Sequence, residues 1–333
     1  MELTGDFVQS MTKIANESSF LAFELEPVVY PQIFKVVDVE QEYGGRDFGQ
    51  MTEIIGQGEP VEIGEVEDHK FFDIGEGWIC FWALRFWQRG FRLTRNQLKN
   101  WASNPKLAEN FVQTQSQQLG ARFAQRRDQL CADVFNRGAI SAGDVKVLNG
   151  SRAGVQVDSY PGKIYDGQPF FSTVHPLKRD AATTFSNFAA ASAISPANLK
   201  AAITALRVTN AKDEHNKPIT QVPDTIVYNP TLDFEIREIL NSTLIAGSAN
   251  NNANSLQNIL NPVPWQKITG TDDWAIGRAK KGLIAHQRGT GPRMVSQVKE
   301  FEGVGVLEFS YIDEFAVCVH QWRDWYGANF PTA

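Results

Sequence analysis

The chain has 333 residues, of which 42% are hydrophobic and 21% are charged, and its formal net charge is −6. This composition is typical of an ordered protein long enough for two compact domains, and it excludes a disordered chain. The sequence pI of about 5.5 argues against a dedicated nucleic-acid binder, because phosphate backbones select for basic domains. No apolar run approaches the roughly 18 residues that a membrane span requires, so no membrane partner is expected.

The first 86 residues predict an arm followed by a flap. Residues 1–33 predict an extended arm, because Pro27 and Pro31 break any helix after the mixed segment 20–25. Residues 34–86 predict strands separated by glycine turns, and therefore a long, two-stranded, hairpin-like flap. Such a flap is only marginally stable by itself in water, so we expect it to lie against another surface.

Charge is segregated between this flap and the segment that follows it. Residues 38–76 contain twelve Asp/Glu and two Lys/Arg, a net of −10, whereas residues 85–137 contain ten Lys/Arg and three Asp/Glu, a net of +7. Opposite charges on neighbouring segments favour a contact between the flap of one copy and the basic segment of another. The alternative is two solvated faces on a monomer.

Residues 105–137 predict one long helix. Pro105 stands at the first helical position, apolar residues recur at helical spacing, and Gly138 follows as a C-terminal cap. Its length would be roughly 50 Å at 1.5 Å per residue, which indicates a strut rather than part of a small enzyme domain. The Arg126–Arg127 pair could hold a phosphate, but the acidic flap favours a basic helix face that meets carboxylates.

The rest of the chain predicts a mixed region and a return to strands. Between residues 139 and 300 we expect a helix that starts at Ser195–Pro196, a helix capped by Thr231 and a β-meander over residues 265–288. Residues 247–258 are rich in Asn and Ser and predict a mobile loop. Residues 301–333 add further strands and an aromatic-rich end.

Residues that carry chemistry are few. The sequence has no phosphate-binding glycine loop, no dinucleotide fingerprint and no Gly-x-Ser-x-Gly elbow, and its five histidines have no second ligand at helical spacing. We therefore expect no catalytic, cofactor or metal site. The three cysteines lie far apart in the sequence, which predicts neither a disulfide framework nor a zinc site and indicates a reducing compartment.

One segment is distinctive, and it reads DGQPFFSTVHP from Asp166 to Pro176. It predicts a tight turn at Asp166–Gly167, a core anchor at Phe171, and a bond from His175 to the backbone or to an acid. As an active site the segment lacks a partner in the sequence. A soluble hydrolase that uses His175 with an acid from elsewhere stays open as an alternative.

The order of these elements resembles the major capsid proteins of tailed bacteriophages, of the Mu-like major head subunit type. The segments that carry the resemblance are DGQPFFSTVHP, SPANLKAAITAL with PDTIVYNP, and ILNSTLIAGSANNNANSLQN. The resemblance implies an α+β, Hong Kong 97-like fold. Its parts would be an N-terminal arm (1–33), an extended β-hairpin loop (34–86), a peripheral domain with a long spine helix (87–180 and 301–333) and an axial domain (181–300).

The same resemblance implies a function without catalysis. The chain would self-assemble into hexamers and pentamers of an icosahedral shell around phage double-stranded DNA, which it would contact non-specifically. The expected partners are further copies of the chain, a separate scaffold protein, a portal protein and, as a further candidate, a decoration protein. The expected location is the virion, and the host cytoplasm during assembly. An encapsulin-like nanocompartment shell is the alternative with the same fold.

On this interpretation, the contact between subunits joins the acidic flap and its apolar base to basic positions on the long helix. The residues expected in it are Glu53, Glu59, Glu62, Glu65, Glu67, Asp68, Trp78, Trp82, Arg122, Arg126 and Arg127.

Overall fold

The computed structural model describes residues 5–55, 75–94, 96–97, 105–140, 164–244, 253–301 and 304–332. The helices are α1 (Gly5–Leu25), α2 (Tyr30–Ile33), α3 (Val39–Tyr43), α5 (Pro105–Asn136), α6 (Pro196–Thr204), α7 (Asp233–Asn241), and the short helical turns η1 (Ala205–Thr209), η2 (Pro230–Leu232) and η3 (Trp322–Asp324). The strands are β1 (Lys35–Asp38), β2 (Phe48–Ile55), β3 (Gly75–Ala83), β4 (Arg85–Leu93), β5 (His175–Pro176), β6 (Thr184–Phe185), β7 (Phe188–Ala189), β8 (Thr225–Tyr228), β9 (Asn261–Pro264), β10 (Trp274–Gly277), β11 (Leu283–Gln287), β12 (Arg293–Phe301), β13 (Val304–Val319) and β14 (Trp325–Ala328).

The first five-stranded sheet is organised by β13. This 16-residue strand pairs antiparallel with β11, β12 and β4, and β1 pairs in parallel with β11. Side chains alternate between the two faces of a strand. Phe309, Tyr311 and Phe315 lie in the cores beneath the helices, whereas Ala316 and Cys318 lie in a separate cluster with β3. One face of β13 therefore carries helices and the other carries the flap.

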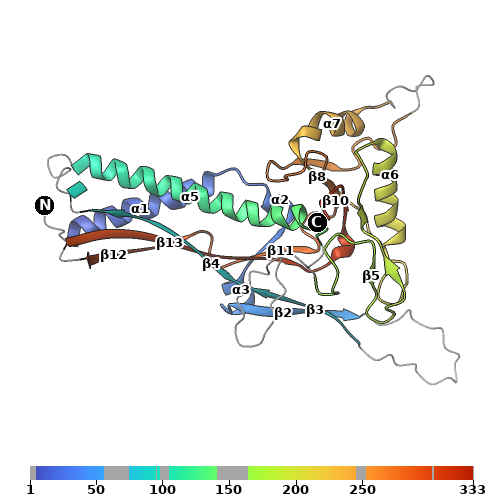
Figure 1. Ribbon diagram of the computed structural model, residues 1–333, viewed down its shortest axis with the longest axis horizontal. Coiled ribbons are helices and arrows are strands. Elements are labelled where there is room, and N and C mark those ends of the chain that lie inside the picture. Colours follow the sequence, from blue (N-terminus) through green and yellow to red (C-terminus); the bar gives the residue numbers. More distant parts are fainter. Residues whose placement is uncertain are drawn as a thin grey trace, which may run out of the picture.

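Helices α1 and α5 lie side by side and run in the same direction along the sheet (Figure 1). The Tyr311 hydroxyl lies 3.2 Å from the Ala15 carbonyl oxygen and 2.9 Å from Ser116 Oγ, so β13 binds both helices. At Gly120 the two helices approach closely, because a Cβ atom there would lie 2.0 Å from the Ser19 carbonyl oxygen. A side chain at this position would push α1 away from α5.

Residues 5–25 are helical, so the prediction of an extended N-terminal arm is wrong for this segment. Met11 and Ala15, one helical turn apart, are buried in the core that α1 forms with the sheet and α5. Pro27 lies beyond the end of α1, and Pro31 occupies the first turn of α2, where the missing N–H costs little. The prolines mark the helix boundaries, and they do not prevent the helix.

The predicted long helix is confirmed as α5, Pro105–Asn136. Near its end, Arg127 is 1% exposed and binds Asp313 of β13 through two hydrogen bonds, 2.9 Å from Nε and 2.5 Å from Nη2. Its Nη1 donates a third hydrogen bond to Gln287 of β11, at 2.7 Å. This buried ion pair fixes the height of α5 over the sheet.

The neighbouring Asp128 fixes the same helix to two other elements. Its Oδ1 atom accepts the backbone N–H groups of Val29 and Tyr30, at 2.9 and 3.0 Å, at the start of α2. Its Oδ2 atom accepts the indole N–H of Trp265 at 2.9 Å. Asp128 therefore holds the chain that leaves α1 and the chain that leaves β9 against one turn of α5.

The flap is a separate two-stranded sheet of β2 and β3, as predicted. Its two strands lie on the opposite side of the first sheet from α5 (Figure 1). The segment around β1 and α3 joins the main sheet instead, and β4 pairs with β13. The observed strands of the flap are therefore shorter than the predicted span of residues 34–86. Residues 56–74 lie outside the described part of the chain.

The second five-stranded sheet has the order β7-β14-β10-β8-β9 and carries α6 and α7 on one face (Figure 1). The predicted start of α6 is confirmed, because Ser195 Oγ accepts the backbone N–H of Asn198 at 3.1 Å. Thr231 does not cap α7 as predicted: it lies in the turn η2, whose cap is Asn229, since Asn229 Oδ1 accepts the Thr231 N–H at 3.0 Å, and α7 follows η2 without a side-chain cap. Of the predicted mobile loop, residues 247–252 lie outside the described part.

The other face of the second sheet packs against the end of α5. Phe135 contacts Trp325 edge to face, with ring centroids 5.2 Å apart. The predicted β-meander over residues 265–288 is wrong, because β10 belongs to this second sheet and β11 to the first. All four residues of β10 are buried, since its two faces lie in different cores. A strand that is buried on both faces shows no alternation of apolar and polar residues, so the sequence does not indicate which sheet it joins.

We predict that Arg127→Met lowers the free energy of unfolding by about 3–5 kcal/mol, because it leaves the buried Asp313 carboxylate without its partner. Urea unfolding of the purified, unassembled subunit measures this loss. Arg126→Met, at the next and exposed position, is the matched control and should cost less than about 1 kcal/mol. An Arg127→Met subunit as stable as the control would contradict a central role for the buried pair.

Candidate inter-subunit surface

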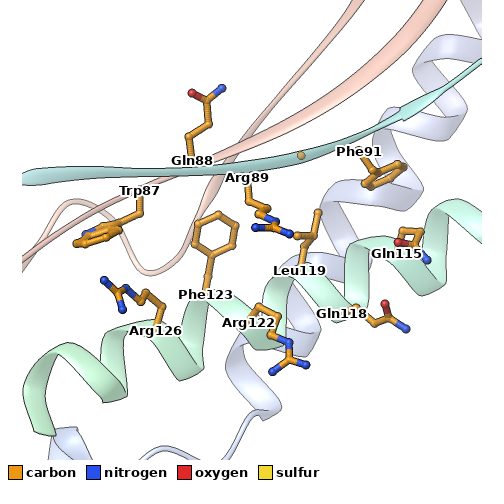
Figure 2. Close-up of a pocket in the computed structure, with 11 residues that line it drawn as sticks. Trp87, Gln88, Arg89, Phe91, Gln115, Gln118, Leu119, Arg122, Phe123 and Arg126 are labelled. Atoms are coloured by element: carbon orange, nitrogen blue, oxygen red, sulfur yellow. The ribbon is translucent and has the colours of Figure 1, made fainter. Parts of the chain in front are cut away.

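A groove of about 620 Å³ runs between β4 and α5 (Figure 2). Strand alternation places three side chains of β4 on the side of α5, and these are Trp87, Arg89 and Phe91. Helical spacing places the lining residues of α5 on one face, and these are Gln115, Gln118, Leu119, Arg122, Phe123 and Arg126. The groove therefore has an apolar floor with long polar side chains around it.

The charge of this groove is positive. Its described lining includes Arg89, Arg122 and Arg126, all exposed, and no acidic side chain. The Arg126 guanidinium lies over the Trp87 ring, 4.4 Å from the centroid, and Arg122 donates to Gln125 at 3.0 Å. Neither of these contacts neutralises an arginine. The surface is therefore suited to an anionic partner.

Two of the three arginines predicted at the contact lie in this groove, and the third does not. Arg122 and Arg126 line it, whereas Arg127 points into the protein and pairs with Asp313. The prediction of Arg127 as a contact residue is wrong, because the 100° rotation per helical residue turns adjacent side chains to different faces. Arg89 was missed, although its spacing from Trp87 and Phe91 along β4 could have indicated it.

The two tryptophans predicted at the contact lie against their own chain. Trp82 is 1% exposed, and its ring stacks on His286 with centroids 4.3 Å apart, so its assignment to the inter-subunit contact is wrong. Trp78 is half-buried, 6.1 Å from the ring of Tyr165. The apolar flap base therefore attaches the flap to the body of the same subunit. The side chain of Glu53, and Glu59, Glu62, Glu65, Glu67 and Asp68, lie outside the described part.

His286 is a buried, neutral group at the base of the flap. Its ring packs against those of Trp82 and Tyr43, which also contact each other, and neither ring nitrogen has a hydrogen-bond partner within the described residues. Burial, with smaller contributions from the charges of His320 and Lys35, lowers the pKa of His286 to about 4. A proton on this ring would therefore disfavour the closed flap base.

The Asp166–Pro176 segment forms a tight turn that folds back on itself. Gly167 has φ of +78°, and its N–H donates to the Ile164 carbonyl oxygen at 3.0 Å. Asp166 accepts the Gln168 N–H at 3.0 Å, and its second oxygen lies 2.6 Å from His175 Nδ1. The acid that was expected to bond with His175 is therefore Asp166, which lies nine residues earlier in the same segment.

The other side of His175 is also enclosed. Its Nε2 atom lies 3.1 Å from Asn187 Oδ1, and its ring stacks on Trp322 with centroids 4.1 Å apart. Phe171 is 1% exposed in the core beside the end of α5. Sequence reasoning missed Asn187 and Trp322, which no local spacing links to His175. Because His175 is 0% exposed, it is placed to brace the core and has no access to a substrate.

Other kinds of site find no support among the residues that the structure describes. No three His, Cys, Asp or Glu side chains in these ranges gather as they would around a metal ion. No helix in them combines the length and apolar character needed to cross a bilayer.

Comparisons with known proteins identify the fold and the family. A family model described as "Phage capsid protein" matches residues 83–328. A structure from Mycobacterium phage Patience is similar with a TM-score of 0.51 at 10% identity, covering 100% of this chain and 89% of that one. The mature capsid of bacteriophage PhiM1 gives a TM-score of 0.51 at 10% identity, covering 91% of this chain and 87% of that one. No curated protein matches.

The fold is the α+β, Hong Kong 97-like fold of proteins that build viral shells. Because the family model covers most of its length, this chain belongs to the phage capsid protein family. It is a major capsid protein, a structural and non-enzymatic subunit that assembles with its own copies into the icosahedral shell of a tailed phage and resides in the virion. The encapsulin and hydrolase alternatives are not favoured.

We predict that His286 contributes a loss of stability as the pH falls from about 6.5 to about 4, because in this window the unfolded chain protonates His286 and the folded chain does not. The contribution is on the order of 2–3 kcal/mol, and Asp273, whose pKa burial raises to about 6, opposes it below that pH. Urea unfolding at several pH values measures the slope. His286→Phe should remove the His286 contribution from it. An equal slope in wild type and His286→Phe would sink this assignment.

Proposed function

We propose that subunits of the shell are joined in part by a contact between the acidic flap of one copy and the groove between β4 and α5 of its neighbour. The observation that carries this proposal is the groove itself, with three exposed arginines and no acid in its described lining. Residues 48–76, from the start of β2 to the start of β3, carry eight Asp/Glu against one Lys/Arg. Complementary potentials of this kind set partner and register more than they set affinity.

The position of the flap strands supports a contact between different copies. β2 and β3 attach to one face of the first sheet, through Trp82 and the cluster around Cys318, while α5 covers the other face. Because β2 and β3 lie on the face opposite to α5, they are directed away from the groove of the same subunit. A neighbouring subunit can present its groove to the flap without this obstacle.

The free edge of β4 supports the same arrangement. β4 pairs with β13 along one edge, and no strand in the described ranges pairs with its other edge. An unpaired edge offers backbone N–H and C=O groups to an extended chain. An extended acidic segment beside Arg89 would satisfy both the backbone groups and the charge.

The strength of the contact would come from repetition. An exposed ion pair contributes about 0.2–1 kcal/mol, so six carboxylates could supply a few kcal/mol at most. Each subunit of a closed shell would make the contact twice, once with its flap and once with its groove. Weak contacts of this kind let misplaced subunits leave a growing shell, while many of them together hold the finished one.

Family membership supports a wider assignment of roles. Residues 1–33 would act as the N-terminal arm, 34–86 as the extended loop, 87–180 and 301–333 as the peripheral domain, and 181–300 as the axial domain. Subunits would form hexamers and pentamers in the host cytoplasm, with a separate scaffold protein and a portal protein as partners. A decoration protein is a further candidate. The shell would then enclose double-stranded DNA without sequence specificity.

We predict that Arg122→Glu with Arg126→Glu abolishes shell formation and leaves the subunit folded. Both side chains are exposed, so the fold does not depend on their charge, whereas the reversed groove would repel the flap. Electron microscopy and sedimentation count the shells, and circular dichroism checks the fold.

Two further variants make this test specific. Adding Glu65→Lys and Glu67→Lys to the double mutant should restore shells, because the contact is re-formed with its charges exchanged. Lys200→Glu with Arg207→Glu, an equal charge change at exposed positions of α6 and η1, should assemble normally. Normal shells from the groove double mutant, or no rescue by the exchanged flap, would overturn the proposed contact.

A further inference from the structure

Two cysteines far apart in the sequence meet at the base of the flap. Cys80 lies in β3 and Cys318 in β13, and both are buried in one cluster, 6% and 5% exposed. Each sulfur lies 3.9 Å from the same atom, the carbonyl oxygen of Phe81, and Cys80 Sγ is also 3.4 Å from the Val319 carbonyl oxygen. The two thiols therefore converge on one point between the flap and the body.

Both cysteines are free thiols in this structure, and both are buried. A hydrogen bond with the Cys80 thiol, followed by burial, raises the pKa of Cys318 well above its ordinary value. The thiolate is the reactive form of cysteine, so at neutral pH Cys318 reacts slowly. The pair would persist as two thiols while the subunit stays in a reducing cytoplasm.

A bond between these two cysteines would change how the base of the flap is held to β13. β2 and β3 form a sheet of their own, and within the described residues no backbone ladder joins β3 to β13. The flap base is held instead by side chains, such as the Trp82 stack on His286 and a hydrogen bond from Lys178 Nζ to the Gly77 carbonyl oxygen. Because an isolated two-stranded sheet is marginally stable, transient opening would admit a small reagent to the sulfurs.

We infer that Cys80 and Cys318 form a disulfide within each subunit when the particle leaves the reducing cytoplasm and meets a low-molecular-weight disulfide. One thiolate attacks the reagent, forms a mixed disulfide and releases one small thiolate. The second cysteine, after losing its proton, attacks the protein sulfur of that mixed disulfide and expels the other small thiolate. The two cysteines are oxidised, the reagent is reduced to two thiols, and the flap base becomes covalently bound to β13. This step is independent of the proposed flap-to-groove contact.

The test uses purified full-length protein, as shells and as unassembled subunits, with 2-hydroxyethyl disulfide as the oxidant. After remaining thiols are blocked in denaturant, intact mass should show one disulfide per chain, and non-reducing peptide maps should join the Cys80 and Cys318 peptides. The rate should rise with pH, because the thiolate attacks. Oxidised subunits should unfold at a higher urea concentration than reduced ones.

Matched variants separate this pair from other thiol chemistry. Cys80→Ser and Cys318→Ser should each abolish the internal disulfide, whereas Cys131→Ser, which removes the buried cysteine of α5, should leave it intact. The wild-type peptide map keeps the test decisive even if a variant fails to fold. Three unmodified thiols after prolonged oxidation, a bond that includes Cys131, or bonds between subunits would each overturn the inference.

Discussion

The architecture depends on two adjacent side chains of α5, one basic and one acidic, that point in different directions. Arg127 reaches down to Asp313 and Gln287 in the sheet, and Asp128 reaches sideways to α2 and Trp265. A buried charge is costly unless hydrogen bonds replace its water, and here each charge has at least three. Arg127 therefore fixes the distance of α5 from the sheet, and Asp128 fixes its lateral position against α2 and Trp265. The first sheet, α1 and the second sheet are all positioned by contacts with this turn of α5 or with its end.

Strand β13 separates two sides of the molecule, one covered by the helices and one covered by the flap. Its alternating side chains place Phe309, Tyr311 and Asp313 under the helices and Ala316 and Cys318 under the flap. The groove lies on the first side and the flap base on the second. This separation explains why the tryptophans of the flap base pack within their own subunit, while no acidic side chain in the described lining neutralises the arginines of the groove. The base would anchor the flap, and the charged surfaces would remain for neighbours.

Sequence reasoning recovered the features that rest on local periodicity. The apolar spacing of α5, the strand pattern of β2 and β3 and the Ser195 cap of α6 are local signals, and the structure has each of these elements. It failed where distant packing decides. The helix of residues 5–25 is stabilised by the sheet and by its close approach to Gly120, which no local pattern contains. The Asp166–His175 contact was within reach from the sequence, but its supports at Asn187 and Trp322 come from far along the chain.

The contrast between Arg126 and Arg127 shows why a charge sum over a segment does not describe a surface. Of the ten basic residues between 85 and 137, Arg127 is neutralised by Asp313 and Arg92 pairs with Glu308, while Arg89, Arg122 and Arg126 gather at one groove. On the proposed contact, this geometry has a consequence for assembly. Flap repels flap and groove repels groove, so only a head-to-tail contact is favourable, and head-to-tail contacts close into rings when the rotation between copies allows it. Segregated charge would therefore select the cyclic arrangement that hexamers and pentamers require, before the second sheets and their helices α6 and α7 of neighbouring subunits make any contact.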